Sequence, residues 1–241
     1  MVELTSVSLT FPPQKARSLR ERISRACGVL PPEDGPQAVT ALRDMSLRIE
    51  RGERVGIVGF NGAGKTTLLK VMCGIYAPSS GRIVVDGDIA CLFELATGFE
   101  MEASGWDNIL TRGLLLGLSR AEIRQRMRDI AEFTELGNAL DRPVKTYSAG
   151  MFVRLAFAVS TAISPDVLLL DEVIAAGDAR FQDKARRRLE DMVARASLLV
   201  LVSHSMETVR QMCTRAIWLH EGRVRLDGSA AEVTAAYERG A

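Results

Sequence analysis

The 241-residue chain lacks the features that mark membrane-spanning, secreted and disulfide-stabilised proteins. A spanning helix needs about 20 largely apolar residues in a row, and the sequence contains no such run. The N-terminus does not show the basic-then-apolar pattern of a signal peptide. The four cysteines are scattered and form no C-x-x-C pair, which is typical of thiols in a reducing cytosol. We therefore expect a cytosolic chain, which leaves docking onto a membrane partner open.

An excess of charge of one sign is also lacking. The 31 basic and 30 acidic residues give a net charge of +1, so no global field favours nucleic acid, and we expect no nucleic-acid partner. Apolar residues make up 47% and charged residues 25%, close to the average soluble globular protein. A chain of this length buries a core without disulfides or a structural metal. These figures exclude a disordered tail, a fibre and a cysteine scaffold.

Short apolar strands alternate with helical stretches along most of the chain. The patterns predict strands over residues 2–11, 41–49, 54–58, 167–170, 198–202, 215–219 and 223–227. Residues 81–93 predict a pair of strands with a turn at 86–88, and residues 65–73 a helix closed by Gly74. Strands that alternate with helices favour an α/β fold with a mainly parallel sheet.

Residues 97–154 carry a helical pattern without strands, which we interpret as an inserted helical subdomain. Ser119 and Glu122 form a capping box, which predicts a helix start at that point. The remaining segments, 1–96 and 155–241, are expected to form the core of one single domain that spans residues 1–241.

A glycine-rich loop carries the clearest chemical pattern. Residues 59–66 match G-x-x-x-x-G-K-[ST], between a strand and an apolar helix. Glycines let backbone N–H groups wrap around phosphate oxygens, and the helix N-terminus adds partial positive charge. Lys65 would reach the β- and γ-phosphates, and the Thr66 hydroxyl would bind Mg²⁺. The predicted ATP contacts are Gly59, Asn61, Gly62, Ala63, Gly64, Lys65, Thr66 and Thr67.

A second pattern places acids and a histidine at strand ends. Asp171 and Glu172 follow an apolar strand, at the edge where ligands bind in open α/β sheets. Asp171 would hold Mg²⁺ through water, and Glu172 would orient or deprotonate the attacking water. The alternative is that both acids merely favour the start of the next helix. His204 follows another strand and is a candidate for contact with the γ-phosphate or the attacking water, or else a hydrogen-bonded turn residue.

Residues 147–151, Tyr-Ser-Ala-Gly-Met, followed by the helix FVRLAFAVS, resemble the signature motif of ABC ATPases. The order of glycine loop, middle loop, signature, Asp-Glu strand and histidine matches over essentially the whole chain. The resemblance implies an ABC ATPase (P-loop NTPase) fold: a mainly parallel core sheet, an antiparallel β part and a helical subdomain with the signature. It also implies a head-to-tail homodimer, in which Ser148 and Gly150 contact the γ-phosphate of ATP held by the other chain. By the same match, Phe11 would stack on adenine.

Two departures from the family pattern indicate a subfamily. Glu94 stands where the middle loop usually has Gln, and Met151 stands where the signature usually ends in Gln. Together with an arginine-rich insertion at residues 12–38, they resemble the ATPases of O-antigen, capsule and teichoic-acid exporters. That resemblance implies an ATP-hydrolysing subunit at the cytoplasmic face of the inner membrane, bound to a separate permease and serving a lipid-linked polysaccharide indirectly. A carboxylate at Glu94 can accept hydrogen bonds from Mg²⁺-bound water, so Glu94 is expected at the metal.

Several alternatives stay open at this point. The insertion, with five basic residues against the single acid Glu21, is either a solvated surface helix or a contact with the membrane subunit or lipid headgroups. The chain ends at Ala241, soon after the core, so we expect no carbohydrate-binding domain. Rival functions are the ATPase of a drug or nutrient transporter, a soluble ABC protein of translation or DNA repair, and a small-molecule kinase. A kinase would not need the signature-like segment, and no heptad tract supports DNA repair.

Overall fold

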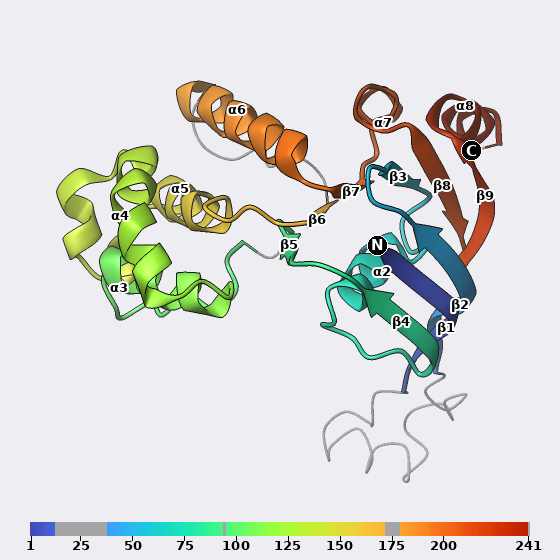
Figure 1. Cartoon of the computed structure of the whole chain (residues 1–241), viewed down its shortest axis with the longest axis horizontal. Helices are drawn as coiled ribbons and strands as arrows, with labels where there is room; N and C mark the ends of the chain where they lie inside the picture. The colour runs from blue at the N-terminus through green and yellow to red at the C-terminus, as the bar shows by residue number, and fades with distance from the viewer. Residues whose placement is uncertain (13–37, 94, 172–178, 241) are drawn as a thin grey trace, which may run out of the picture.

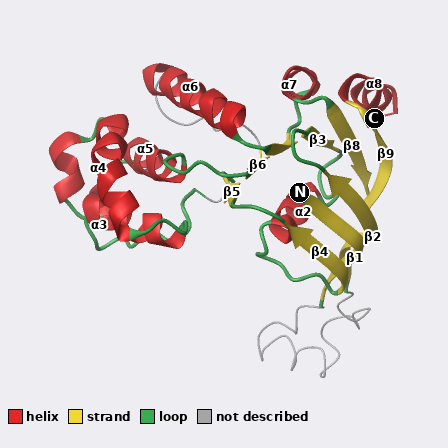
Figure 2. Ribbon diagram, viewed as in Figure 1, coloured by secondary structure: helices red, strands yellow, loops and turns green. Residues whose placement is uncertain are grey.

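The computed structural model of the chain describes residues 1–12, 38–93, 95–171 and 179–240. The strands gather in one lobe, and the helices between residues 105 and 160 form a second lobe beside it (Figure 2). None of the helices in the described segments is long and apolar enough to cross a membrane. The helices of the second lobe begin within residues 97–154, and the predicted division into a core and a helical subdomain stays a prediction.

A six-stranded sheet forms the centre of the larger lobe. Its strands are β3 (Arg54–Val58), β5 (Ile89–Cys91), β6 (Val167–Asp171), β7 (Leu198–Val202), β8 (Arg215–His220) and β9 (Arg223–Ser229). Their order is β5-β6-β7-β3-β8-β9, and only the β8–β9 pair is antiparallel. All five residues of β7 are buried, as expected for a strand covered on both faces. The predicted mainly parallel sheet is confirmed.

A separate antiparallel sheet holds β1 (Val2–Phe11), β2 (Val39–Ile49) and β4 (Ser80–Val85), in the order β2-β1-β4. The prediction that residues 81–93 form one strand pair is wrong, because β4 pairs with β1 and β5 pairs with β6. Contacts outside the turn explain the difference. Asp88 donates its backbone N–H to Asp166 at 3.1 Å, and a Cβ on Gly87 would lie 2.6 Å from Asp166. The turn therefore leads the chain from one sheet to the other.

Helices cover the six-stranded sheet on both faces (Figure 1). α2 (Lys65–Met72) packs between the two sheets, and its Leu68 and Met72 belong to a core that both sheets share. α6 (Ala179–Arg195), α7 (Met206–Met212) and α8 (Ala230–Gly240) cover the opposite face. The strand edge that ends in Asp171 is left for ligands, because the covering helices lie against the faces.

The second lobe contains α3 (Gly105–Leu115), α4 (Arg120–Thr134) and α5 (Ala149–Ser160), with two 3₁₀ turns between α4 and α5. The capping box of Ser119 and Glu122 at the start of α4 is confirmed. A second capping box, of Ser104 and Asp107, starts α3. The expected subdomain boundary after residue 154 lies within α5. Phe181 and Ala185 of α6 join the core of this lobe, so α6 packs against both lobes.

Candidate nucleotide-binding site

The glycine loop connects β3 to α2 and is held from behind by β2. Gly64 caps α2 with φ 101°, a conformation that favours glycine. A Cβ on Gly64 would lie 2.7 Å from the carbonyl oxygen of Ala41, so β2 also leaves no room for a side chain. The first turn of α2 contains no acidic residue. Its N-terminal partial positive charge is therefore available for a phosphate.

Lys65 is a buried cation that is bound to the loop itself. Its side chain is only 7% exposed. The ammonium group donates to the carbonyl oxygens of Gly59 at 2.7 Å and Phe60 at 3.0 Å. These bonds compensate the cost of removing the charge from water and fix the ammonium group along the loop.

Thr66 and Asp171 meet although 105 positions separate them in the chain. The Thr66 hydroxyl donates to a carboxylate oxygen of Asp171 at 2.7 Å. Hydroxyl and carboxylate oxygens suit Mg²⁺, which is usually bound through one or two carboxylates together with substrate phosphates. Within the described segments, no three His, Cys, Asp or Glu side chains form a metal-binding group. The Thr66 hydroxyl and the Asp171 carboxylate fit a Mg²⁺ that is also bound by the phosphates of a ligand.

A cavity of about 260 Å³ joins the glycine loop to the strand ends. Its size suits the phosphate part of a nucleotide, because whole ligand pockets measure roughly 300–1,000 Å³. Its lining consists of Val39, Thr40, Ala41, Asn61, Gly62, Gly64, Lys65, Thr66, Thr67, Asp171 and His204. The structure thus brings most of the predicted phosphate residues together, with His204 opposite them. Gly59 and Ala63 are outside this lining, and the catalytic roles of all these residues remain predictions.

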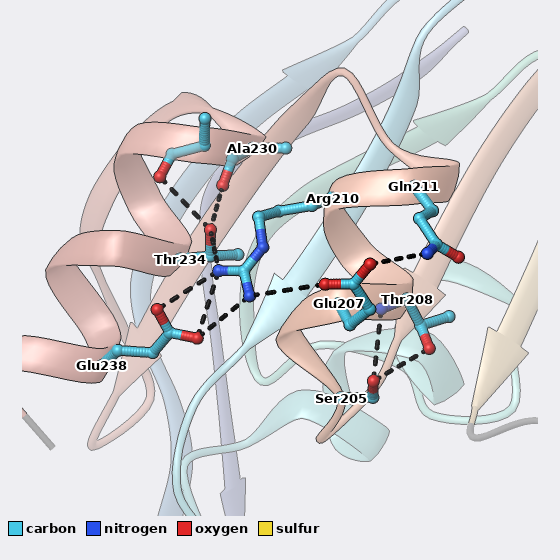
Figure 3. A network of polar contacts seen from close by, with 9 residues as sticks. Ser205, Glu207, Thr208, Arg210, Gln211, Ala230, Thr234 and Glu238 are labelled. Carbon is cyan, nitrogen blue, oxygen red and sulfur yellow. Dashed lines mark hydrogen bonds and ion pairs between the residues drawn. The ribbon is translucent and has the colours of Figure 1, made fainter.

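The segment that carries His204 is tied to the C-terminal helix. Ser205 caps α7 by accepting a hydrogen bond from the backbone of Thr208 at 3.2 Å. Arg210, on α7, donates to both carboxylate oxygens of Glu238 on α8, with its closest contact at 3.1 Å (Figure 3). α7 is therefore anchored at both ends of its short length.

The signature residues lie at a different cavity, of about 470 Å³. Ser148 is the N-cap of α5, where its hydroxyl accepts a hydrogen bond from the backbone of Met151 at 3.3 Å. Ser148 and Gly150 line this cavity together with Glu135, Leu136, Ala139, Arg142, Met151 and Arg154. Of the residues that the structure describes, none lines both this cavity and the phosphate cavity. The signature residues and the predicted phosphate residues therefore line different cavities of the chain.

Phe11 does not line the phosphate cavity but lies beside it. It pairs in register with Val39, which does line the cavity. Its ring meets Tyr76 edge to face, with 5.3 Å between the ring centroids. Stacking of Phe11 on adenine remains a prediction, and Tyr76 is an aromatic neighbour that the motifs did not indicate.

Three predicted features lie outside the described residues. These are Glu94, Glu172 and most of the arginine-rich insertion. The ends of the insertion are described: it connects β1 to β2, whose last and first residues, Phe11 and Val39, face each other in the antiparallel sheet. The roles predicted for these features stay predictions.

Comparisons with known proteins identify the family of the chain. The profile described as "ABC transporter" matches residues 42–175, more than half of the chain. The chain is 47% identical over 199 residues to an O-antigen export system ATP-binding protein, RfbB of Myxococcus xanthus. The match covers 83% of this chain but only 46% of that protein, so the chain spans just under half of its length.

Two further relatives are also named for polysaccharide export, and two solved structures have the same fold. The chain is 45% identical to the O-antigen export ATP-binding protein RfbE of Yersinia enterocolitica, covering 77% of this chain and 78% of that protein. It is 37% identical to the teichoic acids export ATP-binding protein TagH of Listeria innocua, covering 87% and 62%. An ATP-binding subunit of an ABC transporter matches with TM-score 0.72 at 22% identity, covering 100% and 95%. The dimeric ATP-binding cassette MJ0796 with ADP and Pi matches with TM-score 0.69 at 21% identity, covering 95% and 99%.

Proposed function

The chain belongs to the ABC transporter family as an ATPase domain, and from that premise we propose that it is the motor subunit of a polysaccharide exporter. ATP binding would close a dimer of two such chains, and hydrolysis would reopen it. A separate permease would bind the chain at the cytoplasmic face of the inner membrane. The exported molecule would be a lipid-linked polysaccharide.

The phosphate cavity is the observation that carries this proposal. It places a buried ammonium group, a hydroxyl, a carboxylate and an imidazole around one small space. Lys65 would exchange its loop carbonyls for phosphate oxygens, while the N–H groups at the start of α2 bind the same phosphates. Thr66 and Asp171 would hold Mg²⁺, which neutralises charge on the phosphates. Glu172, next in the chain, would orient the attacking water.

The separation of the two cavities supports a dimer. Ser148 and Gly150 lie at the start of α5, and a helix N-terminus attracts the negative charge of a phosphate. In a head-to-tail dimer, the signature cavity of one chain would face the phosphate cavity of the other. A solved dimeric cassette of the same fold is consistent with that arrangement.

The polysaccharide assignment depends on the relatives. Proteins named for O-antigen and teichoic-acid export are 37–47% identical to this chain in alignments that cover 77–87% of it.

Replacement of Glu172 tests the hydrolytic role. The Glu172→Gln variant should bind Mg-ATP with normal affinity but hydrolyse it about 10²–10⁴ times more slowly, because the water loses its base while the phosphate contacts remain. It should also accumulate as an ATP-bound dimer on size exclusion. Glu190→Gln, an exposed glutamate on α6, is the matched control and should keep normal turnover. Near-normal hydrolysis by Glu172→Gln would contradict the assignment.

A further inference from the structure

The C-terminal helix α8 touches the glycine loop through an aromatic contact. Phe60 is 44% exposed, and its ring meets the ring of Tyr237 with 5.5 Å between the ring centroids. The backbone carbonyl of the same Phe60 accepts the hydrogen bond from the Lys65 ammonium. One residue thus contacts both the phosphate-binding lysine and α8.

Tyr237 is itself held firmly on the other side. Its ring meets Trp218 of β8 edge to face, at 5.4 Å between centroids and an interplanar angle of 89°. Trp218 is 4% exposed, and the guanidinium of Arg225 lies 4.1 Å from the centre of its ring. A side chain anchored in this way resists displacement, so it fixes the position of Phe60 rather than following it.

α8 also holds the helix that follows His204. Arg210 of α7 donates three hydrogen bonds of 3.1–3.2 Å to Glu238, and a fourth of 3.3 Å to the hydroxyl of Thr234 (Figure 3). Thr234 is fully buried, and its hydroxyl donates to the carbonyl of Ala230 at 2.7 Å. α7 has only seven residues and begins two positions after His204. Movement of α7 therefore moves the histidine.

We propose that α8 is a positioning element for ATP hydrolysis, with two separable contacts. Tyr237 sets the glycine loop through Phe60, and the Arg210–Glu238 pair sets the His204 segment through α7. This inference rests on the proposed ATPase function and adds residues that do not touch the nucleotide. Because the glycine loop binds ATP and His204 faces the reacting phosphate, the first contact governs ATP affinity and the second governs turnover.

The aromatic contact is tested from both of its sides. Tyr237→Leu keeps apolar bulk on α8 but removes the ring, and Phe60→Leu does the same on the loop. Each should raise KM for ATP about three- to tenfold, from the usual strength of an aromatic pair, with kcat within about twofold. The double variant should show no more than the larger single effect, because both changes remove one contact. Tyr237→Phe keeps the ring and should restore KM.

The polar contact is tested with Glu238→Gln and Arg210→Lys, both of which weaken the charged, forked pairing. These variants should lower kcat about three- to tenfold and leave KM within about twofold. Arg239→Gln, an exposed change of charge on the same helix, is the control and should alter neither constant. Thermal unfolding of every variant reports any loss of fold.

A change in KM alone at the aromatic contact, together with a change in kcat alone at the polar contact, would support the proposal, since general destabilisation does not separate the two constants. If kcat and KM change together and follow the fall in Tm, α8 merely stabilises the fold and the proposal is wrong. Unchanged constants in all variants of an active wild type would overturn only this inference. A wild-type chain without ATPase activity would overturn the proposed function instead.

Discussion

Three side chains of the candidate site already form hydrogen bonds within the protein: those of Lys65, Thr66 and Asp171. Lys65 donates to two loop carbonyls, and Thr66 donates to Asp171. A phosphate and its metal ion would therefore exchange hydrogen bonds within a preformed site. Such exchange costs less than ordering free side chains, because the rotamers are already fixed.

The carboxylate of Asp171 leads to a prediction about metal dependence. Asp171→Asn keeps an oxygen that can accept the Thr66 hydrogen bond but removes the negative charge. We expect the Mg²⁺ concentration for half-maximal ATPase activity to rise at least about tenfold, the size of one lost charge-assisted interaction. Titration of Mg²⁺ at constant ATP measures it. Asp129→Asn, on the exposed face of α4, should leave the Mg²⁺ dependence unchanged, and an unchanged dependence in Asp171→Asn would exclude this residue from the metal site.

Predictions for single residues were possible where the sequence pattern is local. The glycine loop was predictable because eight consecutive residues carry both the backbone freedom and the charge that a phosphate needs. Thr40 and Ala41 were missed although they line the phosphate cavity, since β2 reaches the loop only through the packing of two sheets. The contact of Phe60 with Tyr237 was missed for the same reason, because 177 positions separate the two rings in the chain.

At the scale of elements, α6 is the joint between the two lobes. Cationic side chains of α6 donate hydrogen bonds to backbone carbonyl oxygens at the C-terminal ends of α4 and α5. Lys184 donates to the carbonyl of Phe133 at 3.0 Å, and Arg188 donates to that of Thr161 at 3.4 Å. Cations at helix C-termini offset the partial negative charge there. The basic cleft of about 560 Å³ between α4 and α6 is thus explained by helix capping.

Lys184 also binds Glu135, the residue after α4, at 3.0 Å. Arg154 of α5 lies 3.7 Å from the same carboxylate. The pKa of Glu135 is held below its ordinary value of 4.5, mainly by the hydrogen bond from Lys184. Because the folded-state pKa is the lower one, this carboxylate stabilises the fold above about pH 4.5, and its contribution is lost as the pH falls through the folded-state pKa.

Removal of the Lys184 cation should therefore lower the free energy of unfolding by an amount that depends on pH. Lys184→Met keeps the apolar stem and should lower the free energy of unfolding by about 1 kcal/mol at pH 7, as capping bonds typically contribute. Urea unfolding at pH 7 and pH 3.5 measures this loss, which should be smaller at acid pH. Arg186→Met, with exposed ion pairs on the same helix, should change stability by less than about 0.5 kcal/mol. Equal losses of unfolding free energy in Lys184→Met and Arg186→Met would contradict a specific role of Lys184 between α6 and the helical lobe.

Element types were predicted better than element partners. Apolar runs bounded by turns identified the strands of the core sheet within one or two residues. The pairing of β4 and β5 was wrong because a turn sequence does not reveal that Asp166, far along the chain, holds the turn from outside. The capping box of α3 was overlooked since its third position holds Asp107 in place of the usual Glu or Gln.

At the scale of the whole molecule, the phosphate cavity and the signature cavity, which we propose to be two halves of a nucleotide site, share no lining residue in the described part of the chain. The phosphate cavity is lined by β2, the glycine loop, α2, the end of β6 and the segment after β7, and the signature cavity by residues between α4 and α5 and in the first turns of α5. A head-to-tail pair of chains would supply both halves twice, with two-fold symmetry. No local sequence pattern could show that the two cavities are separate, because this depends on how α6 packs against both lobes.

Mixing two inactive chains tests the shared site. Ser148→Arg fills the signature side and should abolish hydrolysis while a single chain still binds ATP. Lys65→Ala removes the phosphate-binding ammonium group and should also be inactive. A mixed dimer keeps one complete site, made of the glycine loop from the first variant and the signature from the second. Random pairing of equal amounts should therefore restore roughly a quarter of wild-type ATPase activity.

Separate tags on the two variants show whether mixed dimers form, and each variant alone gives the background rate. Recovery above that background requires that the two halves of one site come from different chains, because no chain in the mixture has both intact. If tagged pull-down shows mixed dimers and the ATPase rate stays at background, independent composite sites are excluded. Full activity of Ser148→Arg alone would remove the signature from the site altogether.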